Sequence, residues 1–219
     1  MVRLVYENAV GTELFDEVTV ATDDERIRGV IVEAGGRAVM TSPDHPSGTD
    51  RVAEVARESR ADVIVNIQGD LPFVSYALLA PLVGTMLSEL SVSMATVAVP
   101  ITGREAWLNP NVVKVVTDEH DFALYFSRAP IPVHRDAPDQ PVDGVYGLQH
   151  VGIYAYRRDF LLRFTAWEPT RLERLERLEQ LRALEHGAKI YVARVSGAVL
   201  EVDTEEDLVR ANDVRGDIV

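Results

Sequence analysis

Residues 62–70 read Asp-Val-Ile-Val-Asn-Ile-Gln-Gly-Asp, and this stretch decides the fold class. Its first six residues form an almost continuous apolar run, which is typical of a strand buried on both faces of a parallel sheet. Ligands of open α/β sheets bind beyond the carboxyl ends of the strands. Gln68, Gly69 and Asp70 directly follow this strand, so they occupy the place where a binding site is expected.

Strand and helix patterns alternate on both sides of that strand. Asp23 and Asp24 stand where a helix N-cap is expected, and Gly35-Gly36 stands where that helix should end. This rhythm predicts an α/β domain with a doubly wound, mostly parallel sheet. The other elements expected here are strands at residues 17–21, 37–40, 62–67 and 92–99, and helices at residues 2–10, 49–59 and 77–90.

The second half of the chain is richer in strand patterns. We expect a β-rich segment at residues 112–156, with a Pro-rich connection at residues 130–141. Leucines recur every three residues along residues 171–186, which predicts one long helix that Gly187 ends. The remaining elements expected are a strand at residues 189–195 and a short helix at residues 204–212. No repeat and no separating linker is present, so the 219 residues are predicted to form a single domain.

The composition limits the possible functions. The net charge is −13 and only two residues are lysines, which argues against a nucleic-acid-binding surface. The absence of cysteine excludes disulfides and thiolate metal sites. No apolar run approaches the length that spans a bilayer, and the first residues lack the layout of a signal peptide. We therefore expect a cytoplasmic protein with no membrane partner.

Two acidic residues are candidate metal ligands. Asp70 follows the buried strand, and Asp203 precedes the last expected helix. Mg²⁺ prefers oxygen ligands and usually takes only one or two protein carboxylates. Asp203 is equally well explained as a helix N-cap, and a turn after a strand often carries an aspartate like Asp70. Their separation in the sequence does not establish that they converge.

A polar loop enters the helix expected at residues 49–59. It reads His45-Pro46-Ser47-Gly48-Thr49-Asp50-Arg51 and lacks the Gly-Lys-Ser/Thr ending of a Walker A loop. Such a loop offers backbone N–H groups to an anion or a base edge. From this motif alone, simple helix capping by Ser47 or Thr49 is the favoured interpretation.

Polar side chains of the second half form another candidate group. His150 and Tyr154 are four residues apart on an expected strand and should project to one face. A polar pair on an apolar strand needs partners, which are either other side chains or a polyhydroxylated ligand. A buried histidine satisfied by the protein is the simpler interpretation. Arg128, Glu179 and Gln180 complete the group, although Glu179 and Gln180 fit a solvated face or a subunit contact equally well.

Taken in order, these motifs resemble those of the 3-deoxy-manno-octulosonate cytidylyltransferases, also called CMP-Kdo synthetases. The resemblance runs from about Val5 to Asn212, and the combination of motifs is far more specific than any one of them. The matching stretches are residues 21–26, 44–51, 65–70, 109–114, 123–128, 150–156, 178–182 and 202–204.

The resemblance implies a fold of the nucleotide-diphospho-sugar transferase type and a homodimer. We expect residues 112–156 and the leucine-striped helix at residues 171–186 to contribute to its surface, because the stripe winds around more of the helix than one core face requires. The resemblance also implies a reaction of CTP with 3-deoxy-D-manno-octulosonate, a 3-deoxy-octulosonic acid, for lipopolysaccharide biosynthesis, with Mg²⁺ held by Asp70 and Asp203. The residues implied along the nucleotide are Ser47, Gly48, Thr49, Arg51 and Gln68. Those implied in the sugar-acid pocket are Arg128, His150, Tyr154, Glu179 and Gln180.

Two departures from the family pattern affect these expectations. Family members begin with a central strand and a basic loop that wraps the triphosphate, and this chain begins after that point. We therefore expect the chain as given to make CMP-sugar poorly or not at all, because the loop supplies charge-assisted bonds to phosphate. The family's Gln-Gly-Asp-Glu-Pro also reads with Leu71 in place of the glutamate.

Three interpretations stay open. The chain is part of an active enzyme, or a catalytically impaired homologue that acts as a dimerising or sugar-acid-binding module. In the third, it is a cytidylyltransferase for a related amino-octulosonate or nonulosonate. By resemblance, His150 and the Leu178-Glu179-Gln180-Leu181 stretch favour the plain eight-carbon acid.

Overall fold

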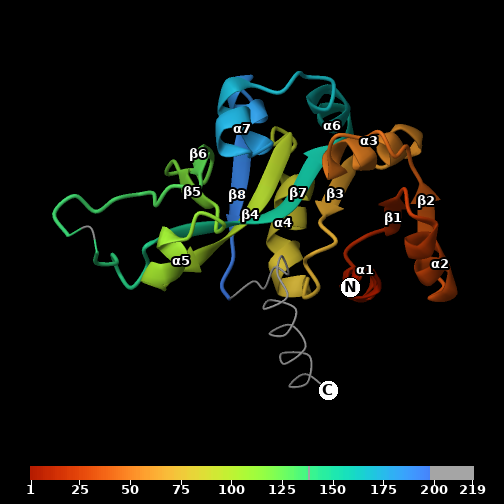
Figure 1. Ribbon diagram of the computed structural model, residues 1–219, viewed down its shortest axis with the longest axis horizontal. Coiled ribbons are helices and arrows are strands. Elements are labelled where there is room, and N and C mark those ends of the chain that lie inside the picture. The colour runs from red at the N-terminus through yellow and green to blue at the C-terminus, as the bar shows by residue number, and fades with distance from the viewer. Residues whose placement is uncertain (138, 198–219) are drawn as a thin grey trace, which may run out of the picture. The chain divides into compact units, whose positions relative to one another are not determined.

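Helices and strands alternate along the chain in the computed structural model, which describes residues 1–137 and 139–197 (Figure 1). The described residues divide into two units. The first unit comprises Met1–Arg60 and Asn66–Ala80, and the second comprises Ala61–Val65 and Pro81–Gly197. Strand β3 (Val63–Ile67) and helix α4 (Tyr76–Ser88) each begin in one unit and end in the other.

The first unit contains a parallel pair of strands and three helices. Strands β1 and β2 pair in parallel from Thr19 opposite Arg37 to Thr22 opposite Met40. Helix α2 begins where the sequence predicts, because the Asp24 carboxylate accepts a hydrogen bond from the Arg26 backbone N–H at 2.8 Å. The elements of this unit are α1 (Val2–Gly11), β1 (Thr19–Thr22), α2 (Glu25–Glu33), β2 (Arg37–Met40) and α3 (Gly48–Glu58).

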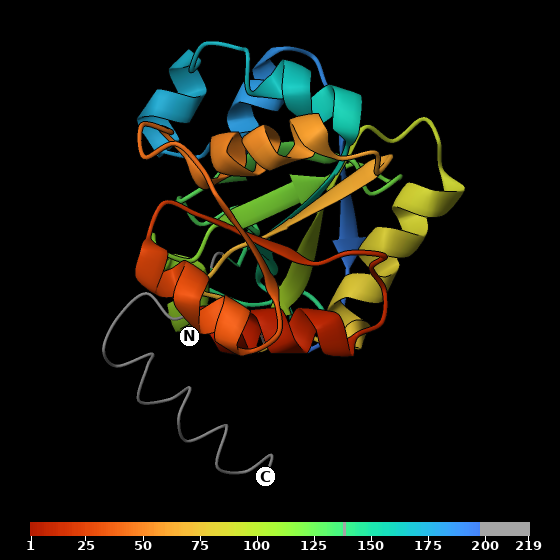
Figure 2. The same cartoon turned by 90° about the vertical axis from the view of Figure 1, so that its right-hand side faces the viewer.

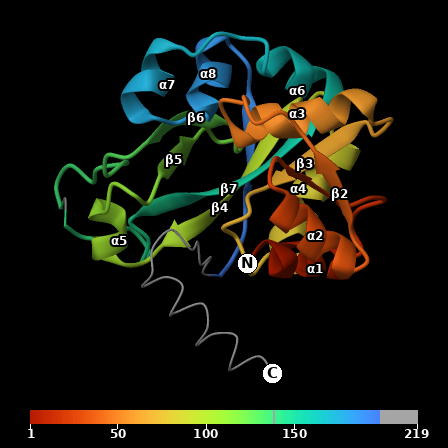
Figure 3. The ribbon, with the colours of Figure 1, turned by 45° about the vertical axis from the view of Figure 1, so that its right-hand side comes forward.

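Helix α1 packs beside α2, as Figures 2 and 3 show. Val5 and Ala9 are the buried residues of α1, and Ile31 of α2 is fully buried. A Cβ atom at Gly36 would lie only 2.7 Å from the Tyr6 ring and 2.8 Å from the Ile31 side chain. Glycine is therefore required at the turn into β2, because any side chain there would displace the packing of α1 on α2.

The second unit is built on a mixed sheet with the strand order β6-β5-β7-β4-β8, and β3 also pairs with β7. Strands β4 and β8 are parallel, whereas β7 is antiparallel to β4 and to β5, and β5 is antiparallel to β6. The elements are β4 (Met94–Ile101), α5 (Arg104–Leu108), β5 (Lys114–Thr117), β6 (Ala123–Ser127), β7 (Gly147–Arg157), α6 (Arg158–Phe164), α7 (Arg171–Glu176), α8 (Gln180–Glu185) and β8 (Ile190–Arg194).

These pairings agree with the sequence-based expectations for the fold class. The chain is of the predicted α/β class, and the antiparallel pairs all involve strands of the β-rich segment 112–156. Strand β4 lies inside the core, since all its residues except Pro100 are buried. Helix α6 covers β7 through an aromatic cluster in which the rings of Tyr156 and Phe164 are 6.2 Å apart.

The single long helix expected at residues 171–186 is wrong. The structure has two short helices there, α7 and α8, because Arg177 adopts a left-handed conformation with φ 54°. The break lets α8 fold back on α7. The Arg182 guanidinium then donates to both carboxylate oxygens of Glu173, at 2.9 and 2.6 Å, and both side chains are buried. This buried ion pair replaces the helical hydrogen bonds that a continuous helix would have made.

The leucine pattern is divided accordingly. Leu178 and Leu181 are buried, whereas Leu175 is 69% exposed. The helix expected at residues 204–212, together with Asp203, lies outside the described residues. Among residues 1–137 and 139–197, no helix has both the length and the apolar character needed to cross a bilayer.

Candidate functional site

The loop that precedes α3 brings several candidate nucleotide-binding residues together. The Ser47 hydroxyl accepts from the Asp50 N–H at 3.2 Å and donates to the Asp50 carboxylate at 2.7 Å. Ser47 is therefore the N-cap of α3, and it is one of the two caps that the sequence offers. A Cβ atom on Gly48 would lie 3.7 Å from the Gln68 side-chain oxygen, so the start of α3 and Gln68 are neighbours.

Thr49 is the innermost residue of this loop. It is 2% exposed, and the Asn66 side-chain amide donates to its hydroxyl at 3.5 Å. Asn66 belongs to β3, so this contact joins the first turn of α3 to the strand that carries Gln68 and Asp70. Ser47, Gly48, Thr49 and Gln68 consequently lie in one neighbourhood of the first unit, where backbone N–H groups at the start of α3 are able to bind an anion or a base edge.

Arg51 is engaged by the protein itself. Its guanidinium donates to the Thr41 hydroxyl at 2.5 Å and to the Ser42 carbonyl at 3.3 Å, and it pairs with the Asp23 carboxylate at 3.1 Å. Thr41 follows β2, and Asp23 follows β1. Arg51 thus ties the carboxyl ends of both parallel strands to α3, which is the end of the sheet where ligands of this fold class bind.

Asp70 is half-buried in the turn after β3, and it is the one candidate metal ligand that the structure describes. The turn is closed by the Leu71 N–H, which donates to the Gln68 carbonyl at 3.3 Å. A partly exposed carboxylate at a strand end suits Mg²⁺, which keeps several waters or phosphate oxygens among its ligands. Asp203 lies outside the described residues, so its convergence with Asp70 stays a prediction. Within the described residues, no three His, Asp or Glu side chains form a cluster that could hold a metal ion.

Leu71, which stands where the family resemblance implies a glutamate, is 2% exposed. Its side chain belongs to the hydrophobic core. The departure from the family pattern therefore places an apolar side chain in the core at this point rather than a carboxylate next to Asp70.

In the second unit, an irregularity in β7 brings His150 and Tyr154 together. On β4, Thr96 is opposite Tyr154 and the next residue, Val97, is opposite Val151, so β7 carries two extra residues at this point. Residues four apart on a regular strand would be about 13 Å apart. Here the two rings are only 5.2 Å apart, and Phe126 contacts His150 edge-on at 5.1 Å. The irregularity in β7 therefore brings the two rings together, which the sequence pattern of a regular strand does not predict.

The Thr96 hydroxyl fills the bulge. It lies 2.7 Å from the Ile153 carbonyl and 3.0 Å from His150 Nε2. The Thr96 hydroxyl uses its one proton to donate to the Ile153 carbonyl, so toward His150 it can only accept. We therefore assign the proton of the neutral imidazole to Nε2, which donates to Thr96. Burial lowers the pKa of His150 to about 3, so the ring is uncharged at neutral pH. The simpler interpretation of His150, a satisfied buried histidine, therefore describes its protein contacts.

Arg128 is held by the end of α7. Its guanidinium donates to the Glu176 carbonyl at 2.8 Å and to the Pro110 carbonyl at 3.0 Å. The Glu176 carboxylate accepts from the Arg128 N–H at 3.0 Å and from the Ser127 hydroxyl at 2.8 Å. These bonds fix the direction of a half-buried cation at the end of β6.

Glu179 and Gln180 stand at the start of α8, which packs against β6 (Figure 3). The Glu179 carboxylate lies 3.5 Å from the Arg182 guanidinium. Gln180 is 4% exposed, and its side-chain nitrogen makes no hydrogen bond to any described residue. A buried amide donor without a partner is costly, so Gln180 is the member of this group whose protein contacts leave a donor for a ligand.

Comparison with known proteins places this geometry in a family. Residues 1–190 match the family model for cytidylyltransferases. A 3-deoxy-manno-octulosonate cytidylyltransferase of Pelobacter propionicus is 46% identical over 97% of this chain and 86% of its own length. One of Geobacter sulfurreducens is 45% identical over 95% of this chain and 86% of its own length.

The solved structure of a CMP:2-keto-3-deoxy-manno-octonic acid synthetase complexed with CTP matches the whole chain. It is 37% identical, the match covers 100% of this chain and 88% of that one, and the TM-score is 0.92. The chain belongs to the cytidylyltransferase family. The fold is therefore the nucleotide-diphospho-sugar transferase fold that the resemblance implies.

Sequence reasoning missed several residues that shape the site of this cytidylyltransferase. Lys114 is fully buried, and its ammonium donates to the carbonyls of Asn109, Val112 and Arg128 at 2.8, 2.5 and 2.7 Å. Burial, reinforced by the positive charge of Arg128, lowers the pKa of Lys114. Two signals in the sequence pointed to it: Lys114 is one of two lysines, and it ends the family-like stretch 109–114. Thr96 and Glu176 had no distinguishing signal.

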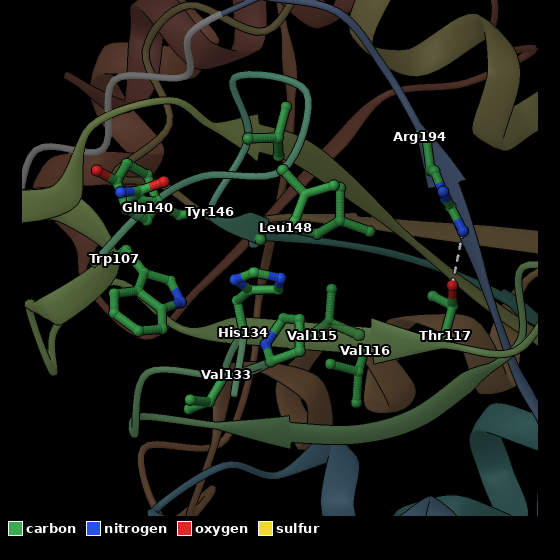
Figure 4. A pocket seen from close by; sticks show the side chains of 14 residues that line it. Trp107, Val115, Val116, Thr117, Val133, His134, Gln140, Tyr146, Leu148 and Arg194 are labelled. Atoms are coloured by element: carbon green, nitrogen blue, oxygen red, sulfur yellow. Dashed lines mark hydrogen bonds between the residues drawn. The ribbon is translucent and has the colours of Figure 1, made fainter. Parts of the chain in front are cut away.

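The cytidylyltransferase also has a cavity of about 530 Å³ in its second unit (Figure 4). Trp107, Tyr146 and His134 lie toward one end, and Arg194 donates to the Thr117 hydroxyl at the other, at 2.7 Å. The Trp107 ring stacks on Tyr146 at 5.7 Å, and its indole N–H makes no hydrogen bond to a described residue. Valines of β5 and of residues 133–145 supply most of the remaining wall.

Proposed function

We propose that the chain transfers a cytidylyl group from CTP to 3-deoxy-D-manno-octulosonate, giving CMP-Kdo and pyrophosphate for lipopolysaccharide biosynthesis. The observation that carries this proposal is the 46% identity, over 97% of this chain, to a relative named 3-deoxy-manno-octulosonate cytidylyltransferase. The likeness over the whole chain to a structure complexed with CTP supports the same choice of nucleotide. In this role the protein works in the cytoplasm, where CTP is made.

In the proposed reaction, the anomeric hydroxyl oxygen of the sugar acid forms a bond to the α-phosphorus of CTP. The bond from that phosphorus to the bridging oxygen breaks, and pyrophosphate leaves with the electron pair. The hydroxyl proton passes to solvent or to a base that the geometry does not identify. Positioning and charge neutralisation supply most of the catalysis in such phosphoryl chemistry.

The first unit supplies the proposed nucleotide site. Backbone N–H groups from Ser47 to Thr49, together with the Gln68 amide, bind CTP in this proposal, and Arg51 holds their supporting strands. Asp70 and Asp203 would hold Mg²⁺, which when bound neutralises charge on the triphosphate. The half-buried carboxylate of Asp70 supports this assignment for the part of the site that the structure describes.

The second unit supplies the proposed sugar-acid site. Arg128 provides the positive charge that a sugar carboxylate needs, and its direction is fixed by Glu176. Neutral His150, Tyr154 and Glu179 offer polar contacts for hydroxyl groups. The side-chain amide of Gln180 is buried without a described partner, so it is suited to donate to a sugar oxygen.

We also propose a homodimer that uses the β-rich segment 112–156. The exposed apolar side chains Leu124, Val133 and Val142, which are 63%, 58% and 56% exposed, support this proposal. Val133 and Val142 also line the cavity, whose other lining side chains are mainly apolar. Burial of such side chains against a second copy would remove apolar surface from water and favour association.

The test of the reaction is pyrophosphate release from CTP and 3-deoxy-D-manno-octulosonate in the presence of Mg²⁺. Asp70→Asn should lower kcat/KM by about 100-fold or more, because loss of a metal-binding carboxylate costs at least as much as loss of its supporting contacts. Asp62→Asn, an exposed aspartate before the same strand, is the matched control and should leave turnover unchanged.

Two outcomes of this assay would redirect the proposal. If an amino-octulosonate or a nonulosonate is turned over faster than 3-deoxy-D-manno-octulosonate, the assigned sugar changes. If the chain binds the sugar acid but releases no pyrophosphate, the alternative of a catalytically impaired sugar-acid-binding module is favoured.

A further inference from the structure

The loop between β2 and α3, residues 41–47, is fastened to α3 by Arg51 and by two residues that have no part in the proposed reaction, Glu54 and His45. This loop leads from Thr41 to Ser47, the N-cap of the helix that begins the proposed nucleotide site. Its conformation therefore decides where the first backbone N–H groups of α3 lie. All residues concerned belong to the first unit.

The peptide groups of Ser42 are held on both sides. The Ser42 N–H donates to the Glu54 carboxylate at 3.1 Å, and the Ser42 carbonyl accepts from the Arg51 guanidinium at 3.3 Å. Arg51 and Glu54 are three residues apart on α3, so both project from the same side of the helix. The two ends of one residue are thus clamped by two charged side chains of opposite sign.

His45 fastens the loop at a second point. Its Nε2 atom forms a short hydrogen bond with the Glu54 oxygen that also accepts from Ser42. His45 is two residues before the N-cap, and its side chain is only 17% exposed. The bond with His45, followed by that with the Ser42 N–H, lowers the pKa of Glu54, so the carboxylate is charged at neutral pH.

We propose that Glu54 and His45 are positioning residues for the nucleotide site: they hold residues 42–45 so that the start of α3 meets CTP in one arrangement. This inference rests on the proposed function. A loop fastened at two points has less conformational freedom to lose when the ligand binds, which favours binding without changing the chemical step. Loss of the fastening should therefore raise KM for CTP more than it lowers kcat.

The kinetic test compares variants of Glu54 with a matched control. Glu54→Ala should raise KM for CTP on the order of 10-fold, with kcat changed less than about 3-fold, because a charge-assisted bond to the loop is lost. Glu54→Gln should recover most of the loss, because its amide oxygen can take the place of the carboxylate oxygen and accept from both the Ser42 N–H and a His45 Nε2–H. Glu58→Ala removes the same charge from an exposed position of α3 and should match the wild type.

His45→Ala provides a second variant that leaves both ends of Ser42 clamped. It should raise KM for CTP less than Glu54→Ala does. Equal KM values for wild type and Glu54→Ala would overturn the proposal. The proposal would also be overturned if Glu54→Ala lost kcat and thermal stability in parallel and Glu54→Gln restored neither. A purely structural role of Glu54 predicts that pattern.

Hydrogen–deuterium exchange gives a readout that does not depend on turnover. Without ligand, a peptide that covers residues 41–48 should exchange about 10-fold faster in Glu54→Ala than in wild type or Glu58→Ala. If the wild type turns over no sugar acid but this difference is found, the proposed function fails and the fastening of the loop stands. If exchange is the same in all three proteins, the positioning role is wrong even when the enzyme is active.

Discussion

His150 shows how one residue of the site is adapted to its surroundings. The ring is buried against Phe126 and Tyr154, and its Nε2 atom lies 3.0 Å from the Thr96 hydroxyl. Burial in this environment disfavours the charged form. His150 can therefore act toward a ligand as a neutral hydrogen-bonding group and not as a cation. In the proposed sugar-acid site, the charge of the sugar acid would then be balanced by Arg128.

The first prediction at this scale concerns pH. The pKa of His150 falls from 6.5 to about 3 on folding, so between these values the unfolded chain binds a proton that the folded chain does not. The contribution of this residue to the free energy of unfolding is thus fully present above pH 6.5. It is lost as the pH falls below 6.5, by about 1.4 kcal/mol per pH unit. Urea unfolding between pH 7 and 4.5 should show this slope for wild type and a shallower one for His150→Gln, which can still donate to Thr96.

His120→Gln is the control for that experiment, because His120 is exposed at the turn between β5 and β6. It should keep the wild-type slope. If His150→Gln has the same slope of unfolding free energy against pH as the wild type, the His150 imidazole is not held neutral in the folded protein.

At the scale of elements, α7 and α8 depend on the ion pair between Glu173 and Arg182. The Glu173 carboxylate also accepts from the Thr170 N–H at 2.9 Å, so it caps α7 while it binds α8. The Arg182 guanidinium also lies over the Phe164 ring at 5.0 Å. One buried pair thereby sets the angle between two helices that carry Glu176, Glu179 and Gln180.

We predict that Glu173→Ala lowers the free energy of unfolding by about 3–5 kcal/mol, because it leaves a buried guanidinium without its partner. Glu168→Ala, an exposed change in the connection before α7, should cost less than about 0.5 kcal/mol. The double variant Glu173→Ala with Arg182→Met should be more stable than Glu173→Ala alone, since the unpaired charge is removed. Equal costs for Glu173→Ala and Glu168→Ala in urea unfolding would show that the pair does not hold the two helices.

At the scale of the whole molecule, the proposed homodimer can be tested by light scattering. We predict that the wild type has the mass of a dimer and that Val133→Asp with Val142→Asp is a monomer, because two charges would then have to be buried in the contact. Leu90→Asp is the control: Leu90 is 81% exposed outside the β-rich segment and should not affect the dimer. A monomeric wild type at high concentration, or a dimer that survives both aspartates, would contradict the proposed surface.

Much of the fold could be predicted from the sequence because it depends on neighbours along the chain. The apolar run before Gln68 predicts β3, and a cap at Ser47 or Thr49 predicts the start of α3 to within a residue or two. Helix α1 and the order of alternating strands and helices follow from the same local patterns. The set of motifs, read in order, was also enough to indicate the family and the nucleotide.

The tertiary structure alone decided how the site is supported. Glu173 and Arg182 pair across the break at Arg177, and helical periodicity contains no sign of that contact. His150 meets Tyr154 because β7 bulges around the Thr96 hydroxyl, 54 residues earlier in the chain than His150. Lys114 and Arg51 likewise bind groups that only folding brings within reach. Local propensity depends on adjacent residues and can therefore be predicted from the sequence. A buried charge or a bulge is stabilised by partners from distant segments, and only the packed structure brings those partners together.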